Sequence, residues 1–335
     1  LMTNVHSIGS SDRDFTVSSL LSGGAEGLSV VRDARRAPSG MEPLDRMLGG
    51  GFRMGDMILL GGRPGVGKTI AGLQWARAAA RDGSTAVVVS YEHDEQTLLG
   101  RLLALEIGML ELGPVDLQVE QLVTACLNGE WMAGDEAGRH PLVRAAVAQV
   151  ETYADRLVLV PASRVRIDLA GIEELFAAVD TDRKLLVVDY VQKVPIAGRL
   201  SSWDADGARD VAERLKELAL SAGGAIVAIA AVDEAGLQAR RVRLPHLRAA
   251  AAMSYEADIA IMMNEKALST SKVHLAYDLT RLEAFEKRIV FSIEKNRSGR
   301  SALDLEFVKD FQRFRFEPDG DFVAETLIDG VVVDN

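Results

Sequence analysis

The stretch Met57-Ile-Leu-Leu-Gly-Gly-Arg-Pro-Gly-Val-Gly-Lys-Thr-Ile70 decides how this chain folds. Its first four residues form an apolar run that predicts a buried strand, and the alanine- and leucine-rich residues 70–80 predict a helix. Between them, residues 62–69 match the phosphate-loop pattern G-x-x-x-x-G-K-[ST] in full. Strand, loop and helix are the context that this pattern requires, so we expect a nucleotide to bind here.

The glycines of this loop let backbone N–H groups point at phosphate oxygens, and the helix N-terminus adds its positive end. Lys68 is expected to neutralise charge on the β- and γ-phosphates, and the Thr69 hydroxyl to hold Mg²⁺. The alternative is a glycine-rich turn with a solvated lysine, which the regular flanking elements disfavour. The residues expected to contact the nucleotide are Gly62, Arg63, Pro64, Gly65, Val66, Gly67, Lys68, Thr69 and Ile70.

Composition limits the class of protein. The 335 residues are 48% hydrophobic, which indicates a globular chain with a sizeable core. No run of eighteen apolar residues and no signal-peptide pattern is present, so we expect a cytoplasmic protein. The single cysteine, Cys126, excludes an internal disulfide and a multi-cysteine metal site. Because the net charge is −11, any contact with nucleic acid must come from a local basic patch.

The chain divides into three parts. Residues 1–37 read as a flexible leader whose apolar piece, Phe15 to Leu21, is a candidate short linker helix. Residues 38–317 alternate buried strands with helices, which predicts an α/β core with a mostly parallel, twisted sheet flanked by helices. Strands are expected at 85–90, 157–160, 185–189, 225–230 and 259–263, with antiparallel strands at 289–294, 303–307 and 311–316 on the edge. Residues 318–335 are acidic and form either a loose tail or an edge strand.

Two acids complete the expected ATPase site. Asp189 ends the apolar run Leu185-Leu-Val-Val-Asp189, the Walker B pattern for an acid near Mg²⁺. Its alternative is an ordinary turn residue at a strand end. Glu92 follows the second strand, and if that strand lies next to the first, Glu92 can polarise water beside the phosphate loop. Its alternative is decoration of the following helix N-terminus.

The order of these motifs resembles the C-terminal ATPase domain of the DnaB-type replicative helicases, a RecA-like P-loop NTPase fold. The resemblance covers about residues 38–317. It rests on Pro38-Ser-Gly with Leu44-Asp45, the phosphate loop, Ser90-Tyr-Glu92-His-Asp-Glu-Gln-Thr-Leu-Leu-Gly-Arg101, Val188-Asp189-Tyr190-Val-Gln192, residues 247–258, and Glu294-Lys295-Asn-Arg297-Ser-Gly299.

The resemblance implies a set of roles and partners. Glu92 becomes the catalytic glutamate, Arg101 a nucleotide contact, and Asp189 with Thr69 the Mg²⁺ ligands. Lys295 and Arg297 would reach the ATP of a neighbouring subunit. The implied cofactors are ATP and Mg²⁺, the implied partner is single-stranded DNA, and the implied assembly is a homo-oligomer, a hexameric ring.

Two features depart from the family. Its N-terminal helical domain has no counterpart in residues 1–37. At the end of the strand 226–230 the family places a glutamine that senses the γ-phosphate, and here that position is Ala231. We therefore expect weak coupling between hydrolysis and DNA movement. If the coupling is strong instead, another residue, Asp233 or Gln192, has to carry it.

Four arginines cluster in this otherwise acidic chain: Arg240, Arg241, Arg243 and Arg248. They either contact single-strand phosphates in a central channel or pair with acids on the surface, and the sequence does not decide. Three functions stay open: an oligomeric motor on single-stranded DNA, a RadA- or KaiC-like ATPase switch without unwinding, and a scaffold that binds ATP but barely hydrolyses it.

Overall fold

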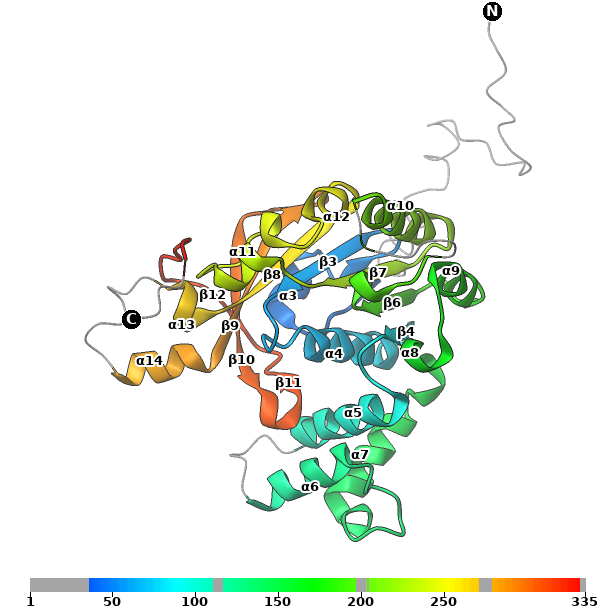
Figure 1. Ribbon diagram of the computed structural model, residues 1–335. Coiled ribbons are helices and arrows are strands. Elements are labelled where there is room, and N and C mark those ends of the chain that lie inside the picture. The colour runs from blue at the N-terminus through cyan, green and yellow to red at the C-terminus, as the bar shows by residue number, and fades with distance from the viewer. Residues whose placement is uncertain (1–35, 111–116, 197–202, 204, 271–278, 332–335) are drawn as a thin grey trace, which may run out of the picture.

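The computed structural model describes residues 36–110, 117–196, 203, 205–270 and 279–331 (Figure 1). Its centre is one sheet in the order β11-β10-β9-β8-β3-β7-β6-β4-β5, with β12 paired to β10. The strands are β3 (Met57–Gly62), β4 (Thr85–Ser90), β5 (Leu157–Pro161), β6 (Lys184–Asp189), β7 (Ala225–Ala230), β8 (Ile259–Glu265), β9 (Arg288–Asn296), β10 (Leu303–Asp310), β11 (Arg315–Phe316) and β12 (Asp321–Phe322). A separate ribbon pairs β1 (Arg36–Ala37) with β2 (Phe52–Arg53).

The sheet is parallel in its middle and antiparallel at one edge. Strands β8, β3, β7, β6, β4 and β5 run parallel. Strands β9 and β10 then alternate in direction, and β11 and β12 both pair antiparallel with β10. Every residue of β3, β6 and β7 is buried, as expected for parallel strands covered by helices on both faces. The predicted fold class is confirmed.

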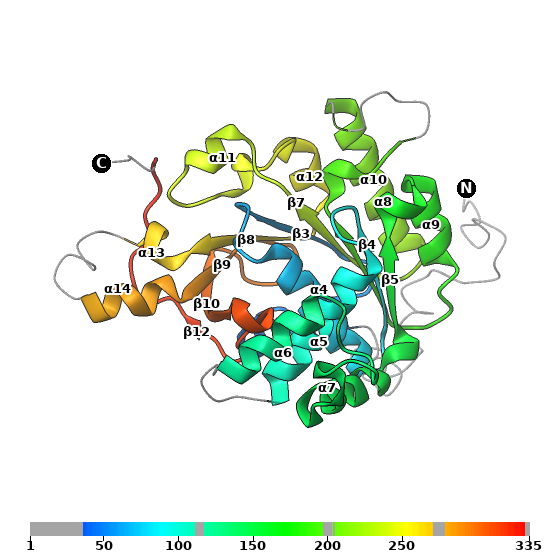
Figure 2. The same ribbon diagram turned by 60° about the horizontal axis from the view of Figure 1, so that its bottom comes forward.

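Helices cover both faces of this sheet. The helices of the described residues are α3 (Glu42–Met47), α4 (Lys68–Arg81), α5 (Glu95–Leu110), α6 (Leu117–Leu127), α7 (Pro141–Glu151), α8 (Ala162–Val165), α9 (Leu169–Ala177), α10 (Ala205–Ser221), α11 (Glu234–Gln238), α12 (Ala250–Glu256), α13 (Lys266–Ser269) and α14 (Leu279–Glu286). Helices α10 and α12 lie on one face and α4 on the other (Figure 1). Helices α5, α6 and α7 enclose a smaller core that contains Cys126, a free thiol (Figure 2).

The C-terminal edge differs from the simple strand expected at residues 311–316. The segment begins as a 3₁₀ turn, Phe311–Arg313, and only Arg315–Phe316 pair with β10. Asp310 accounts for this turn, because its carboxylate accepts hydrogen bonds from Arg313 at 3.0 Å and from Arg315 at 3.1 Å. Within the C-terminal acidic segment, Asp321–Phe322 form the two-residue edge strand β12, and Ile328 N donates to Ser269 O at 2.8 Å.

Two further expectations concern the candidate linker helix and a membrane-spanning helix. The candidate linker helix at Phe15 to Leu21 lies outside the described residues. Among the residues that the structure describes, no helix is long and apolar enough to cross a membrane.

Candidate nucleotide-binding site

The phosphate loop joins the buried end of β3 to the first turn of α4. Gly67 caps α4 with φ 95°, a left-handed conformation, and a Cβ there would lie 2.7 Å from Phe311 Cζ and 2.8 Å from Phe316 Cζ. Only glycine fits this position, so the C-terminal edge of the sheet holds the loop in place. Gly65 also has positive φ, but a Cβ on it would meet nothing within 4 Å, so this side of the loop is open. The loop therefore presents backbone N–H groups and a helix N-terminus to an accessible space.

Lys68 lies folded over this loop. Its Nζ donates to the carbonyls of Gly62 and Arg63, both at 2.8 Å. Burial lowers the pKa of Lys68 to about 8, although the carboxylates of Asp189 and Glu92 act in the opposite direction. Among the described residues, no carboxylate forms a hydrogen bond with this ammonium group, and an incoming phosphate would supply an anionic partner.

Thr69 and Asp189 meet at the foot of the same loop. Thr69 Oγ1 donates to Asp189 Oδ2 at 2.7 Å, although 120 positions separate the two residues in sequence. Burial raises the pKa of Asp189 to about 6, even though the hydrogen bond from Thr69 lowers it. No group of three or more His, Cys, Asp or Glu side chains in the described part of the chain could hold a metal by itself. Two hard oxygen donors at a phosphate loop fit Mg²⁺, which takes one or two protein oxygens and completes its shell with phosphates and water.

Glu92 lies near Lys68 and Asp189, but the strand that it follows is not beside β3. Strand β4 is not the neighbour of β3, because β7 and β6 lie between them in the sheet. The expectation of adjacent strands is wrong, since the crossover through α4 spans positions that later segments of the chain fill. Glu92 still comes near Asp189 because Ser90, two residues earlier, pairs with Asp189 in the register of β4 and β6.

The surroundings of Glu92 separate it from a role at the helix start. Asp94, not Glu92, caps the following turn, where its Oδ1 accepts from Thr97 N at 2.8 Å. Glu92 Oε1 instead lies 3.6 Å from Lys193 Nζ. Lys193 thus partly neutralises the charge of the Glu92 carboxylate at this site. The sequence did not point to Lys193, because nothing in its local pattern distinguishes it from other lysines.

Arg101 points toward the same acids from α5. Burial lowers its pKa, while the charges of Asp189 and Glu92 act to raise it. Its Cζ lies 5.1 Å from the centre of the Phe314 ring, and its Nε is buried with no hydrogen-bond partner among the described residues. A partly buried guanidinium with one buried, unused donor suits an anionic ligand.

Lys295 and Arg297 lie at the opposite end of the sheet. Ile259 pairs with Ile58 on one side and with Asn296 on the other, so this pair sits beside the start of β3. Gly62 is four residues further along β3, about 13 Å away at the rise of a parallel strand. Within one copy of the chain, Lys295 and Arg297 therefore cannot reach the phosphate loop.

The chain is similar to known proteins over most of its length. The family model of the DnaB-like helicase C-terminal domain matches residues 37–316, most of the chain. The chain belongs to this family. The replicative DNA helicase DnaB of Geobacillus stearothermophilus is 22% identical over 282 residues, which are 83% of this chain and 56% of that protein. The chain thus spans about half the length of the curated relatives that it matches over most of its own length.

Two further similarities differ in how much of this chain they cover. A solved structure of a DnaB-like replicative helicase and its interactions with primase superimposes with a TM-score of 0.66 at 17% identity, covering 90% of this chain and 69% of that one. This likeness shows the fold. The DNA repair protein RadA of Brucella abortus is 42% identical, but over 79 residues, which are 24% of this chain and 16% of that protein. Similarity to RadA is therefore regional, whereas the DnaB-like match runs through the core.

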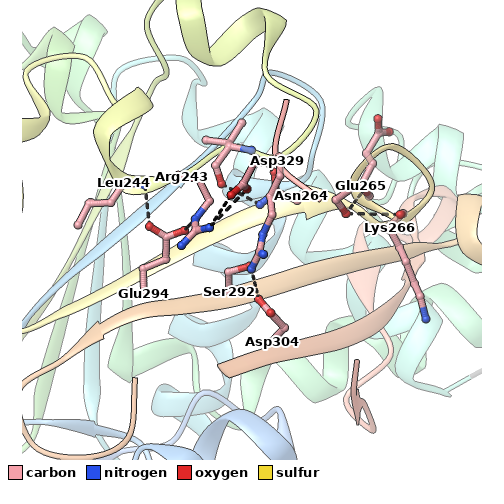
Figure 3. Close-up of polar contacts among 12 residues, drawn as sticks. Arg243, Leu244, Asn264, Glu265, Lys266, Ser292, Glu294, Asp304 and Asp329 are labelled. Carbon is pink, nitrogen blue, oxygen red and sulfur yellow. Dashed lines mark hydrogen bonds and ion pairs between the residues drawn. The ribbon is translucent and has the colours of Figure 1, made fainter. Parts of the chain in front are cut away.

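The arginine cluster of this DnaB-like domain is largely engaged within the protein. Arg243 pairs with Glu294 and lies 3.2 Å from Asp329 (Figure 3). Arg241 lies 2.5 Å from Asp304. Arg240 Nε donates to Leu268 O at 3.1 Å. Arg248 is exposed. The ion pairs of Arg241 and Arg243 match the surface-pairing alternative, and the DNA role of the cluster stays a prediction that rests most directly on Arg248.

A cavity connects this cluster to the phosphate loop. Its volume is about 240 Å³, and it is lined by Arg63, Pro64, Gly65, Val66, Arg240, Met263, Asn264, Glu265 and Leu268. Arg63 Nε also donates to Gly236 O of α11 at 3.3 Å. The phosphate loop and the segment that carries the arginines are thus in direct contact.

Ala231 stands where the family resemblance places a glutamine, and its backbone N–H and C=O groups both form hydrogen bonds with the Gln192 side chain. Gln192 Oε1 accepts from Ala231 N at 3.1 Å, and Gln192 Nε2 donates to Ala231 O at 3.3 Å. Asp233 is already used as the N-cap of α11, where it accepts from Gly236 N at 2.8 Å. Asp233 and Gln192 are the two candidates for coupling hydrolysis to DNA movement. Of these, Gln192 is the residue whose side chain joins the end of β7 to the turn that follows Asp189.

Proposed function

We propose that this chain is the ATP-hydrolysing core of a DnaB-type motor that assembles with copies of itself and acts on single-stranded DNA. The observation that carries this proposal is the bond between Thr69 and Asp189 beside the folded-back Lys68. These groups come from a helix N-terminus and a distant strand, and together they offer what Mg²⁺-ATP requires. The family membership adds support to the same conclusion.

Each side chain has one task in this proposal. Bound Mg²⁺ would neutralise charge on the β- and γ-phosphate oxygens, and Thr69 and Asp189 would hold it. Lys68 exchanges its two carbonyl acceptors for a phosphate oxygen. Glu92 leaves its ion pair with Lys193 and orients the attacking water, from which it accepts a proton. Arg101 directs its unused donor at the nucleotide.

The proposal requires more than one copy of the chain. Lys295 and Arg297 lie beside the start of β3, far from their own phosphate loop. A cation that completes the charge stabilisation of phosphoryl transfer can be supplied in trans by a neighbour. We therefore propose that Arg297, with Lys295, serves the ATP of the next copy in a closed ring, with six copies as the family resemblance implies.

Nucleic acid would contact the arginine cluster through its phosphates. Arg248 is exposed, whereas Arg241 and Arg243 must exchange acidic partners for phosphate oxygens. Such contacts are independent of base sequence and weaken as salt rises. We propose single-stranded DNA as the partner and retain the cytoplasmic location as a prediction.

The test measures ATP hydrolysis with and without single-stranded DNA, alongside molar mass by light scattering. We expect Mg²⁺-dependent hydrolysis, an oligomer, and salt-sensitive DNA binding that Arg248→Ala weakens equally for all base sequences. Lys68→Ala is the matched control, because it removes the phosphate contact and should abolish ATP binding. A wild-type protein that binds ATP but shows neither hydrolysis nor assembly would refute the motor and leave the scaffold.

A RadA- or KaiC-like ATPase switch is the second candidate, and Ala231 favours it. A methyl group cannot hydrogen-bond a γ-phosphate, and both backbone groups of Ala231 are already bonded to Gln192. The motor therefore loses one route by which nucleotide state moves the DNA-facing segment. Hydrolysis in an assembled protein that binds no single-stranded DNA, even at low salt, would select the switch.

A further inference from the structure

One carboxylate organises the end of the sheet opposite the phosphate loop. Asp258 precedes β8, and its side chain is 10% exposed. Its Oδ2 accepts from Met57 N at 2.8 Å and from Lys216 Nζ at 2.7 Å. Its Oδ1 accepts from Arg297 at 3.2 Å. Oδ2 therefore binds the first residue of β3, and Oδ1 binds Arg297.

The same place fixes Arg297 in a second direction. Its guanidinium donates to Tyr255 O, near the C-terminal end of α12, at 2.7 Å, and its backbone N donates to Asp258 O at 2.9 Å. Lys295 Nζ donates to Ser254 O at 2.7 Å. The carbonyls of Ser254 and Tyr255 belong to the last turn of α12, where the helix dipole favours cations. Arg297 is nevertheless 47% exposed, so part of its donor set faces outward.

The guanidinium of Arg297 is held by two partners, the Asp258 carboxylate and the Tyr255 carbonyl. A guanidinium bonded to a carboxylate on one side and a carbonyl on another has its plane set, because the donors of arginine are rigidly related. An exposed arginine without these contacts would sample many rotamers, and ordering it on contact with a phosphate would cost free energy. Asp258 is also bonded on its other oxygen to Lys216, which donates to Gly55 O at 2.8 Å. The carboxylate itself is therefore fixed.

We propose that Asp258 is a positioning residue that presents Arg297 to the ATP site of the neighbouring copy of this chain. This inference rests on the proposed function, in which Arg297 acts in trans. Asp258 does not touch the nucleotide in this scheme. It holds the guanidinium in the orientation that the next phosphate loop meets, and through Met57 N it joins that guanidinium to the strand that ends in its own phosphate loop.

Asp258→Asn is the sharpest perturbation. The Oδ2 position receives two donors, Met57 N and Lys216 Nζ, so the asparagine oxygen is retained there. Its amide NH₂ group then faces Arg297, and because both groups are donors they cannot form a hydrogen bond. The substitution therefore releases Arg297 and keeps the bond to β3. We expect kcat for ATP to fall about tenfold to a hundredfold, as for a small misplacement of a catalytic group, with KM little changed.

Mixed assemblies separate this role from damage to the protein's own site. Lys68→Ala keeps Arg297 and lacks a working phosphate loop, whereas Arg297→Ala has the reverse defect. Mixing the two should restore part of the hydrolysis. Asp258→Asn should gain activity when mixed with Lys68→Ala and none when mixed with Arg297→Ala. Native mass spectrometry of size-tagged copies confirms that mixed assemblies form. Glu173→Gln, which weakens the ion pair between Glu173 of α9 and Arg214 of α10, is the matched control expected to leave kcat unchanged.

The opposite pattern overturns the inference. If Asp258→Asn is restored by Arg297→Ala and not by Lys68→Ala, its defect lies in its own phosphate loop. If Lys68→Ala and Arg297→Ala fail to restore each other in proven mixed assemblies, the trans role fails and the inference fails with it. Asp258→Glu, which keeps the charge beside Lys216 but displaces the guanidinium, gives the same test if Asp258→Asn does not fold.

Discussion

The carboxyl group of Asp189 is buried, and this burial has a measurable cost in stability. The residue is 3% exposed, and burial raises the pKa of its carboxyl from 3.8 to about 6. Between these two values the folded protein binds more protons at Asp189 than the unfolded chain does, so stability falls as pH rises through this window. Above pH 6 the penalty is fully present. A difference of about two pH units corresponds to about 3 kcal/mol at pH 7.

Asp189→Asn removes this penalty with little change in shape. The amide oxygen still accepts from the Thr69 hydroxyl, and the amide cannot ionise. We expect the free energy of unfolding of the metal- and nucleotide-free variant to exceed that of the wild type by about 3 kcal/mol at pH 7 and by roughly half as much at pH 5. The same substitution should abolish Mg²⁺-dependent hydrolysis, because one of the two protein oxygens for the metal is lost.

The assay is urea unfolding in EDTA at pH 7 and pH 5. Asp319→Asn, at an exposed position, is the control and should change stability by less than about 0.5 kcal/mol. Added Mg²⁺-ATP should stabilise the wild type and not Asp189→Asn, since only ligand bound to the folded state contributes. An asparagine variant no more stable than the wild type at pH 7, or a gain that does not shrink at pH 5, would refute the reasoning that the buried charge carries the cost.

Three other predictions follow from the same site. Glu92→Gln should bind ATP like the wild type and release no ADP in a coupled assay; wild-type turnover would exclude Glu92 as the base. ATP affinity should fall as pH rises above 8, because Lys68 has then lost the proton that a bound phosphate must restore; calorimetry at pH 9 in buffers of different ionisation enthalpy should show proton uptake, and an affinity constant from pH 7 to 9.5 would contradict the lowered pKa. Ala231→Gln should increase stimulation of hydrolysis by single-stranded DNA at unchanged ATP affinity; strong stimulation in the wild type that the variant does not raise would assign the coupling to Gln192.

The phosphate loop, most of the buried strands and the two acids could be predicted from the sequence. Each depends on residues close together in the chain: the glycines that permit the loop, the apolar runs at Met57–Gly62 and Lys184–Asp189, and the helix start at Lys68. A local pattern sets these features because backbone hydrogen bonding and burial over a few residues are enough to specify them. The β11 segment was less predictable, since the Asp310 contacts that turn Phe311–Arg313 into a 3₁₀ helix involve specific side chains.

Tertiary structure alone decided the order of the strands and the partners of the charged groups. Nothing local distinguishes a β4 beside β3 from a β4 beyond β7 and β6, because the order depends on which later strands fill the gap. The bond from Met57 to Asp258 spans 201 positions, and the one from Ala231 to Gln192 spans 39. A carboxylate or amide chooses among many donors of the same kind according to which of them burial brings within reach, and that choice exists only after the sheet has formed.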